Sequence, residues 1–306
     1  MSTPPAPPPV HDPEPSGPGT DDAIIRVENF AAVYDGKTIL KDINFLVHRR
    51  EILVIAGESG CGKSTLLRHI IGLETPDRGR ILVEGDDLNI DSEEDRRRIL
   101  RKIGVAFQSG ALFGSMSVLE NVALPLVMYT RLPKPIIDSI ALTKLQLVGL
   151  ADTAQRQPAE LSGGMQKRAA IARALALDPQ IIFLDEPSAA LDPFTSAELD
   201  QLVLSLRKLL NMTFVIISHQ LPSIFTIADH VVLIRGENKT IVADGDPKTL
   251  RDSSPDPWVR AFFNRQLPPS HPRSAGMGQA AAENQAGAQE RSALTSEANH
   301  EHSALL

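Results

Sequence analysis

The stretch EILVIAGESGCGKSTLLRHIIGL, residues 51–73, places an apolar run, a glycine-rich loop and a segment of helical spacing one after another. Such an apolar run is typical of a buried parallel strand. The loop, GESGCGKST, matches G-x-x-x-x-G-K-[ST], in which successive N–H groups surround phosphate oxygens at the start of a helix. The strand before the loop and the helix after it argue against a chance glycine turn. The stretch therefore predicts an α/β fold with a phosphate-binding loop.

Residue types within this loop have separate roles. Glycines allow the backbone to approach a phosphate closely, Lys63 can reach the β- and γ-phosphates, and Ser64 can offer its hydroxyl to Mg²⁺. Cys61, the only cysteine of the 306 residues, is interpreted as a small spacer and has no partner for an internal disulfide. The predicted nucleotide-binding residues of the loop are Gly57, Glu58, Ser59, Gly60, Cys61, Gly62, Lys63, Ser64 and Thr65.

Two further apolar runs end in polar residues. QIIFLDEP, residues 180–187, ends in Asp185, which is suited to holding Mg²⁺ through water, and Glu186, which is suited to polarising water. Strands that end in acids are common, and it is the phosphate loop of the same chain that favours the functional interpretation. TFVIISHQ, residues 213–220, ends in His219. Functional groups at the carboxyl ends of parallel strands are expected to meet at one edge of the sheet.

A Ser-Gly-Gly turn precedes a helical pattern in LSGGMQKRAAIARAL, residues 161–175. Alone, such a turn is an ordinary helix cap. After the two preceding motifs, however, the chain resembles the nucleotide-binding subunits of ABC transporters, whose signature is LSGGQ; Met165 stands at its last place here. The resemblance implies that Ser162, Gly163 and Gly164 bind the γ-phosphate of ATP held by the opposite subunit. A homodimer is therefore expected.

The resemblance extends over about residues 27–245 and implies roles for further residues. It implies that Tyr34 stacks on adenine and that Asp192, in SAALD, lies at a nucleotide-containing dimer contact. The implied catalytic residues are Glu186, His219, Gln108 and Lys63. The implied Mg²⁺ ligands are Ser64, Gln108 and Asp185. The other histidines considered are interpreted as structural: His48, His69 and His230.

Residues 107–126, FQSGALFGSMSVLENVALPL, are largely apolar and contain no basic residue. The resemblance implies that an integral membrane permease docks a short helix here, near Gln108–Leu126. The side chains expected to face it are Leu112, Phe113, Met116 and Val118. The same residues could instead fill the core of a helical subdomain. The preceding basic run, Arg96 to Lys102, is interpreted as a solvated helix face.

Three short segments, FQSGALF, LSGGM and DPWVRAFF, are similar to the ATPases of maintenance-of-lipid-asymmetry (Mla) systems and their Mce-associated relatives. This resemblance implies ATP hydrolysis that powers transport of phospholipids or other hydrophobic lipids. Mce-type lipid-binding proteins and small cytoplasmic accessory subunits would be further partners. A transporter of ions, amino acids or drugs is an alternative, because it would use the same ATPase.

A third alternative is a soluble ABC ATPase that acts on ribosomes or DNA. The chain has a single cassette, an N-terminal arm with four acidic residues and no Lys or Arg, and a folded part close to neutral. These features disfavour a nucleic-acid partner. No apolar run approaches the roughly 20 residues needed to cross a bilayer, and the N-terminus does not resemble a signal peptide. The expected location is the cytoplasmic side of the inner membrane, as a peripheral protein held by the permease.

The predicted organisation has four segments. Residues 1–22 are proline-rich and are expected to be disordered. Residues 23–252 form the ABC ATPase domain, with a P-loop NTPase (RecA-like) core, an antiparallel β subdomain and an inserted helical subdomain at about 109–177. Residues 253–267 are expected to form an aromatic helix, and 268–306 a disordered tail.

The aromatic helix is predicted from its own residues. Asp256 and Pro257 suit a helix start, and Trp258, Phe262 and Phe263 fall on one face. A helix this short is not stable alone. It is therefore expected to pack on its own ATPase core or, alternatively, to reach the neighbouring subunit of the dimer.

Overall fold

The computed structural model describes residues 22–90 and 92–267 and divides into two compact units between Pro255 and Asp256. The predicted disordered segments, 1–22 except for Asp22 and 268–306, lie outside the described residues.

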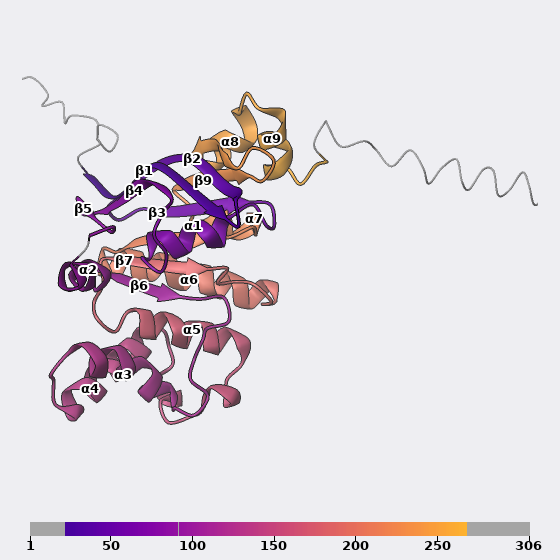
Figure 1. Cartoon of the computed structure of the whole chain (residues 1–306). Coiled ribbons are helices and arrows are strands. Elements are labelled where there is room, and N and C mark those ends of the chain that lie inside the picture. Colours follow the sequence, from indigo (N-terminus) through magenta and orange to yellow (C-terminus); the bar gives the residue numbers. More distant parts are fainter. Residues whose placement is uncertain (1–21, 91, 268–306) are drawn as a thin grey trace, which may run out of the picture. The chain divides into compact units, whose positions relative to one another are not determined.

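A six-stranded sheet forms the centre of the first unit (Figure 1), and its strand order is β10-β9-β3-β8-β7-β6. All neighbouring pairs are parallel except β10 with β9. The apolar runs of the sequence form its buried inner strands, as predicted. The strands are β3 (Ile52–Gly57), β6 (Ile103–Ala106), β7 (Ile181–Asp185), β8 (Thr213–Ile217), β9 (His230–Arg235) and β10 (Thr240–Gly245).

A second, antiparallel sheet has the order β2-β1-β4-β5. Its strands are β1 (Ala23–Tyr34), β2 (Lys37–His48), β4 (Arg78–Val83) and β5 (Asp86–Asp87). The segment GRILVEGDDL, residues 79–88, contains two strands because Glu84 and Gly85 both adopt positive φ, 51° and 85°, in a tight turn. Apolar side chains of this sheet share one core with the six-stranded sheet and α1 (Lys63–Ile70).

The predicted helical insert is present between β6 and β7. It contains α3 (Val118–Tyr129), α4 (Lys134–Leu147), the 3-10 helices η2 (Ala151–Thr153) and η3 (Pro158–Glu160), and α5 (Gly163–Ala174). These three α-helices pack on one another, and α5 also packs on β6 and on α6 (Pro193–Leu210). In Figure 1, α3 and α4 lie on the opposite side of the six-stranded sheet from β1 and β2. The insert is therefore connected to the core mainly through α5.

The remaining helices of the first unit are α2 (Glu93–Leu100), α7 (Leu221–Ile227) and α8 (Pro247–Ser253). The basic side chains of α2 are largely exposed, as expected for a solvated face. None of the helices in the described ranges is both long and apolar enough to cross a bilayer.

The second unit contains α9 (Pro257–Phe263), which is shorter than the predicted segment 253–267. Asp256 caps it by accepting a hydrogen bond from the Trp258 amide at 2.8 Å. The Trp258 ring stacks on Phe262 with 5.8 Å between centroids, and Phe262 meets the edge of Phe263 at 5.3 Å. The aromatic side chains of this helix therefore contact one another.

Candidate active site

The register of the parallel strands brings the motifs to one edge of the sheet. Ile217 of β8 is aligned with Ile55 of β3 on one side and with Asp185 of β7 on the other. The phosphate loop begins two residues after Ile55, and His219 lies two residues after Ile217. On the next strand, Ala106 is aligned with Leu184, and Gln108 follows two residues later. Residues separated by up to 162 positions therefore converge at the carboxyl ends of adjacent strands.

Two glycines of the phosphate loop occupy positions where a side chain does not fit. A Cβ at Gly57, where φ is 151°, would lie 2.3 Å from the Ile234 carbonyl oxygen. A Cβ at Gly62, where φ is 105°, would lie 2.9 Å from the Leu40 side chain. Positive φ and close approach together explain the glycine requirement of the motif.

The buried Lys63 side chain folds back over this loop. Its Nζ donates to the carbonyl oxygens of Gly57 at 2.9 Å and Glu58 at 2.8 Å. These two contacts hold the ammonium group over the loop. Cys61 is buried, and its burial raises the pKa of the thiol, with Lys63 opposing this in part. The thiol is thus kept protonated, in agreement with its interpretation as a spacer.

The first turn of α1 is available to an anion. Its N-cap residue, Gly62, provides no side-chain acceptor, and the first turn contains no acidic residue. The Ser64 side chain is exposed and Thr65 is half-buried. Amide groups at a helix N-terminus attract negative charge through both hydrogen bonds and the helix dipole.

Asp185 and Glu186 carry buried oxygen atoms that lack a protein partner. Within the described residues, Oδ1 of Asp185 and Oε2 of Glu186 accept no hydrogen bond. Burial, followed by the neighbouring Glu186, raises the pKa of Asp185, while Lys167 and Lys63 act in the opposite direction. Glu186 also has a positive φ of 45°. Unsatisfied carboxylate atoms and a strained backbone are typical of a functional site.

These oxygen atoms fit a divalent cation. Mg²⁺ prefers oxygen ligands and is commonly held by one or two carboxylates together with substrate phosphates. No cluster of three or more His, Cys, Asp or Glu side chains suited to a metal occurs in the described ranges. A cation here would therefore depend on Asp185, on nearby hydroxyl or amide oxygens and on a bound phosphate.

His219 and Tyr34 approach acidic residues from other elements. The Nδ1 atom of the exposed His219 lies 2.7 Å from Oε1 of Glu186. At the end of β1, Tyr34 is 39% exposed and its hydroxyl donates to Oε2 of Glu74. Glu74 therefore holds the hydroxyl of Tyr34, while the exposed part of the ring can stack on a planar ligand.

The signature residues begin α5, as the sequence predicts. The hydroxyl of Ser162 accepts a hydrogen bond from the Met165 amide at 3.3 Å. Ser162 and Gly163 are exposed, whereas Gly164 lies where α5 meets α6, and a Cβ there would be 2.4 Å from Thr195 Cγ2. Of the three signature residues, Gly164 thus also has a clear packing role.

Asp192 has a local structural role. Its Oδ1 caps α6 by accepting hydrogen bonds from the amides of Phe194 at 3.0 Å and Thr195 at 3.1 Å. The Thr195 hydroxyl also donates to this carboxylate, and these bonds lower the pKa of Asp192. The structure therefore provides a capping function for a residue that the sequence resemblance places at a dimer contact.

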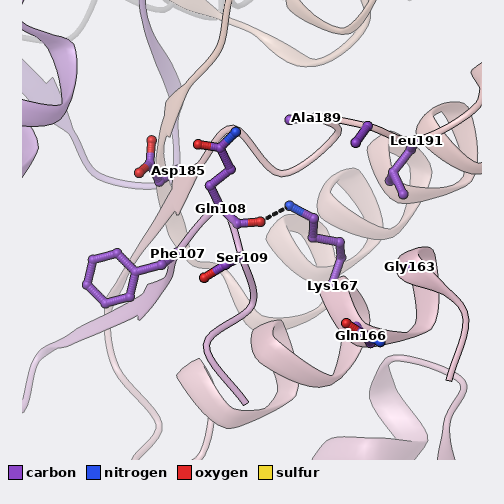
Figure 2. A pocket seen from close by; sticks show the side chains of 10 residues that line it. Phe107, Gln108, Ser109, Gly163, Gln166, Lys167, Asp185, Ala189 and Leu191 are labelled. Atoms are coloured by element: carbon purple, nitrogen blue, oxygen red, sulfur yellow. Dashed lines mark hydrogen bonds between the residues drawn. The ribbon is translucent and has the colours of Figure 1, made fainter. Parts of the chain in front are cut away.

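A cavity of about 540 Å³ lies beside Asp185 and Gln108 (Figure 2). It is bounded by the residues after β6, the first turns of α5 and the loop after β7. Its lining residues are Phe107, Gln108, Ser109, Gly163, Gln166, Lys167, Asp185, Ala189, Ala190 and Leu191. None of the phosphate-loop residues 57–65 lines this cavity.

The predicted docking stretch is only partly exposed. Phe113 is 51% exposed, and Leu112 and Met116 are half-buried. Val118, predicted to face a partner, is instead fully buried as the first residue of α3, and Leu126 is also buried. The expectation for Val118 was wrong because the first turn of α3 places this side chain in the core of the insert.

Three residues of this region were missed from the sequence. Asn121 is fully buried and exchanges hydrogen bonds with the backbone of Phe113, at 2.8 and 3.0 Å. Lys167 and Arg173, on α5, both donate to backbone carbonyl groups just after β6. Their residue types alone do not identify these backbone partners.

Comparison with known proteins gives a consistent result. The family model described as "ABC transporter" matches residues 40–189. The intermembrane phospholipid transport system ATP-binding protein MlaF of Escherichia coli K12 is 42% identical over 241 residues, covering 79% of this chain and 88% of MlaF. The probable ribonucleotide transport ATP-binding protein mkl of Mycobacterium leprae is 39% identical and covers 78% and 68%, respectively. A dimeric ATP-binding cassette solved in a post-hydrolysis state with ADP and Pi has a TM-score of 0.66 and 31% identity, covering 72% of this chain and 98% of that one.

Proposed function

The chain belongs to the ABC transporter family as an ATP-hydrolysing subunit, and from this premise we propose that it powers phospholipid or other hydrophobic lipid transport through a separate membrane permease. The similarity to MlaF over most of both chains supports this substrate class. The observation that carries the catalytic part is the carboxylate of Glu186, held by His219 on one oxygen and without a partner among the described residues on the other.

In this proposal, each residue at the carboxyl ends of the strands has its own role in ATP hydrolysis. Glu186 accepts a proton from the attacking water through its free oxygen, and His219 holds the carboxylate and contacts the γ-phosphate. Lys63 leaves its two carbonyl partners and offsets charge on the β- and γ-phosphates. Tyr34 stacks on adenine. The backbone from Gly57 to Thr65 surrounds the phosphates.

Ser64, Gln108 and Asp185 are proposed to hold Mg²⁺. When bound, the cation would supply positive charge that offsets the negative charge of the phosphates. Asp185 is the strongest candidate ligand, because its Oδ1 is buried and accepts no hydrogen bond from residues 22–90 and 92–267. The Gln108 side chain is exposed beside the same carboxylate (Figure 2).

A homodimer supplies the second half of each proposed site. Ser162, Gly163 and Gly164 offer a hydroxyl and amide groups at the start of α5 to the γ-phosphate bound by the partner subunit. Asp192 lies at the same contact while its carboxylate caps α6. The existence of dimeric cassettes of the same fold supports this arrangement.

The proposed permease contact lies at Gln108–Leu126, with Phe113 as its most exposed aromatic side chain. The chain would then be a peripheral protein on the inner face of the inner membrane. Mce-type lipid-binding proteins and small accessory subunits are proposed as further members of the complex. The domain limits proposed for this function are 23–252, with the insert at about 109–177 and the aromatic segment at 253–267.

Purification of the tagged full-length chain from detergent-solubilised native membranes tests the proposed substrate. We expect a permease to co-purify, together with a lipid-binding partner and phospholipid detectable by mass spectrometry. ATP hydrolysis by the complex should increase in phospholipid vesicles relative to detergent. A complex whose ATPase activity responds to ribonucleotides instead would favour the activity named for mkl. Recovery with ribosomes and without a permease would contradict the proposal.

A further inference from the structure

Lys167 joins the signature helix to two parts of its own active site. Its Nζ donates to the backbone carbonyl of Gln108, as Figure 2 shows, and lies 3.5 Å from the Glu186 carbonyl oxygen. Gln108 follows β6 and Glu186 follows β7, so one ammonium group contacts the ends of two adjacent strands. The side chain is half-buried beside the cavity, where its position is well defined by surrounding atoms.

Arg173 contacts the same loop one and a half turns further along α5. Its Nη2 donates to the Gly110 carbonyl at 2.9 Å and its Nη1 to the Ala111 carbonyl at 2.8 Å. Gly110 and Ala111 both have positive φ, 71° and 47°. This conformation is unfavourable for alanine. The guanidinium group therefore stabilises a turn that the local sequence alone does not favour.

Neighbouring Arg168 shows that such a contact is not a general property of α5. Its guanidinium pairs with the carboxylate of Glu198 on α6 instead, at 2.5 Å. The basic side chains of α5 thus bind different groups. Two of them, Lys167 and Arg173, bind the backbone of the residues that follow β6, and Lys167 also approaches Glu186.

We propose that Lys167 is a positioning residue that transmits contact between Ser162 and the partner subunit's ATP to Gln108 and Glu186 of its own site, with Arg173 holding the adjoining turn. This inference rests on the proposed function, in which the start of α5 meets the partner's nucleotide. A rigid helix carries displacement from Ser162 to Lys167, which lies five residues further on. The lysine then moves the two strand ends together, so occupancy of one composite site changes the geometry of the other.

Hydrogen–deuterium exchange of the full-length chain, without nucleotide, measures the contact directly. The Gly110 amide donates to the Phe107 carbonyl at 2.8 Å and reports the turn. In Lys167→Met, which keeps side-chain length but removes the donor, exchange at residues 109–112 should rise about tenfold, as expected for loss of a hydrogen bond to a charged group. Lys167→Arg should restore slow exchange. Arg168→Met is the matched control and should leave these amides unchanged.

The second measurement is the ATP dependence of hydrolysis. Two coupled sites allow a Hill coefficient between about 1 and about 2. Lys167→Met should lower this coefficient to about 1. Lys167→Arg and Arg168→Met should keep the wild-type coefficient. Unchanged exchange in Lys167→Met, faster exchange throughout the central sheet, or a wild-type coefficient of about 1 would each overturn the proposal. Failure of the proposed function would be distinguishable, because the wild-type phosphate loop at 57–65 would then gain no protection from ATP.

Discussion

The Nδ1 atom of His219 lies 2.7 Å from Oε1 of Glu186, so the end of β8 holds the carboxylate at the end of β7. The other oxygen of this carboxylate is buried and has no partner in the described part of the chain. Glu186 also has a positive φ, which is uncommon for a residue with a long side chain. The contact therefore fixes one oxygen of the carboxylate and leaves the other available to a ligand.

Glu186→Gln should retain ATP binding and lose turnover by a factor of about 10² to 10⁴, because an amide has a similar shape but is a poor base. ATP-bound dimers should accumulate. Phosphate release and size-exclusion chromatography with ATP and Mg²⁺ measure both effects. Glu198→Gln, on α6, is a control that removes a carboxylate elsewhere. Wild-type turnover in Glu186→Gln would exclude the general-base role.

His219→Ala should reduce turnover through Glu186. Residues that act as one unit give non-additive losses. The double variant Glu186→Gln/His219→Ala should therefore be no slower than Glu186→Gln alone, when single-turnover rates are compared at saturating ATP. Multiplied losses would show that the histidine acts independently of the carboxylate.

Mixed dimers of Lys63→Ala and Ser162→Ala should recover activity that both homodimers lack. Both changes fall in the same composite site of the mixed dimer, so the second site remains intact. Ser162→Ala also removes a helix cap, at a cost of about 1 kcal/mol. Ser92→Ala is the matched control, since Ser92 caps α2 through an equal 3.3 Å contact with the Asp95 amide. Mixed dimers no more active than either homodimer would argue against separate composite sites.

Phe113→Asp should abolish co-purification with the permease while leaving ATP binding and thermal stability close to wild type, because this side chain is half exposed. Val118→Asp should lower the unfolding free energy by more than about 3 kcal/mol, because it buries an unpaired charge. Leu209→Asp, at an exposed position on α6, is the surface control. Normal assembly of Phe113→Asp would move the permease contact elsewhere.

Deprotonation of His230 should make the fold less stable at alkaline pH. Burial opposes the charge, but hydrogen bonds with Asp244 and Glu51 outweigh it and raise the pKa of His230 to about 9. The contribution is complete below the unfolded-state pKa of about 6.5 and is lost as pH rises through about 9. This contribution to the free energy of unfolding is at most about 3 kcal/mol, and solvent screening at the exposed Asp244 makes it smaller.

Thermal unfolding at about pH 6 and about pH 10 tests this linkage. The wild-type melting temperature should fall between the two values more than that of His230→Gln, which lacks the titrating group. Parallel curves for the two proteins would show that the His230 interaction does not contribute to stability.

Local patterns were sufficient for those parts of the fold where one segment determines its own structure. The apolar runs at β3, β7 and β8 were predicted as buried parallel strands, and the glycines of the phosphate loop were assigned from the motif and from backbone freedom. Three strands, β2, β6 and β9, were not predicted. Strand β2 has mixed polarity and pairs with β1, which immediately precedes it, whereas β6 has only four residues and its partner β7 is distant in sequence.

The sequence alone therefore determined the α/β class, the phosphate loop, the acidic strand end and the start of α5, because each is encoded by residues within a few positions of one another. Only the tertiary structure decided which polar atoms meet. It showed that Glu186 contacts His219, that Val118 is buried, and that Lys167 binds the backbone at Gln108. Such contacts depend on strand register and helix packing, which are set by the burial of the whole core rather than by any one segment.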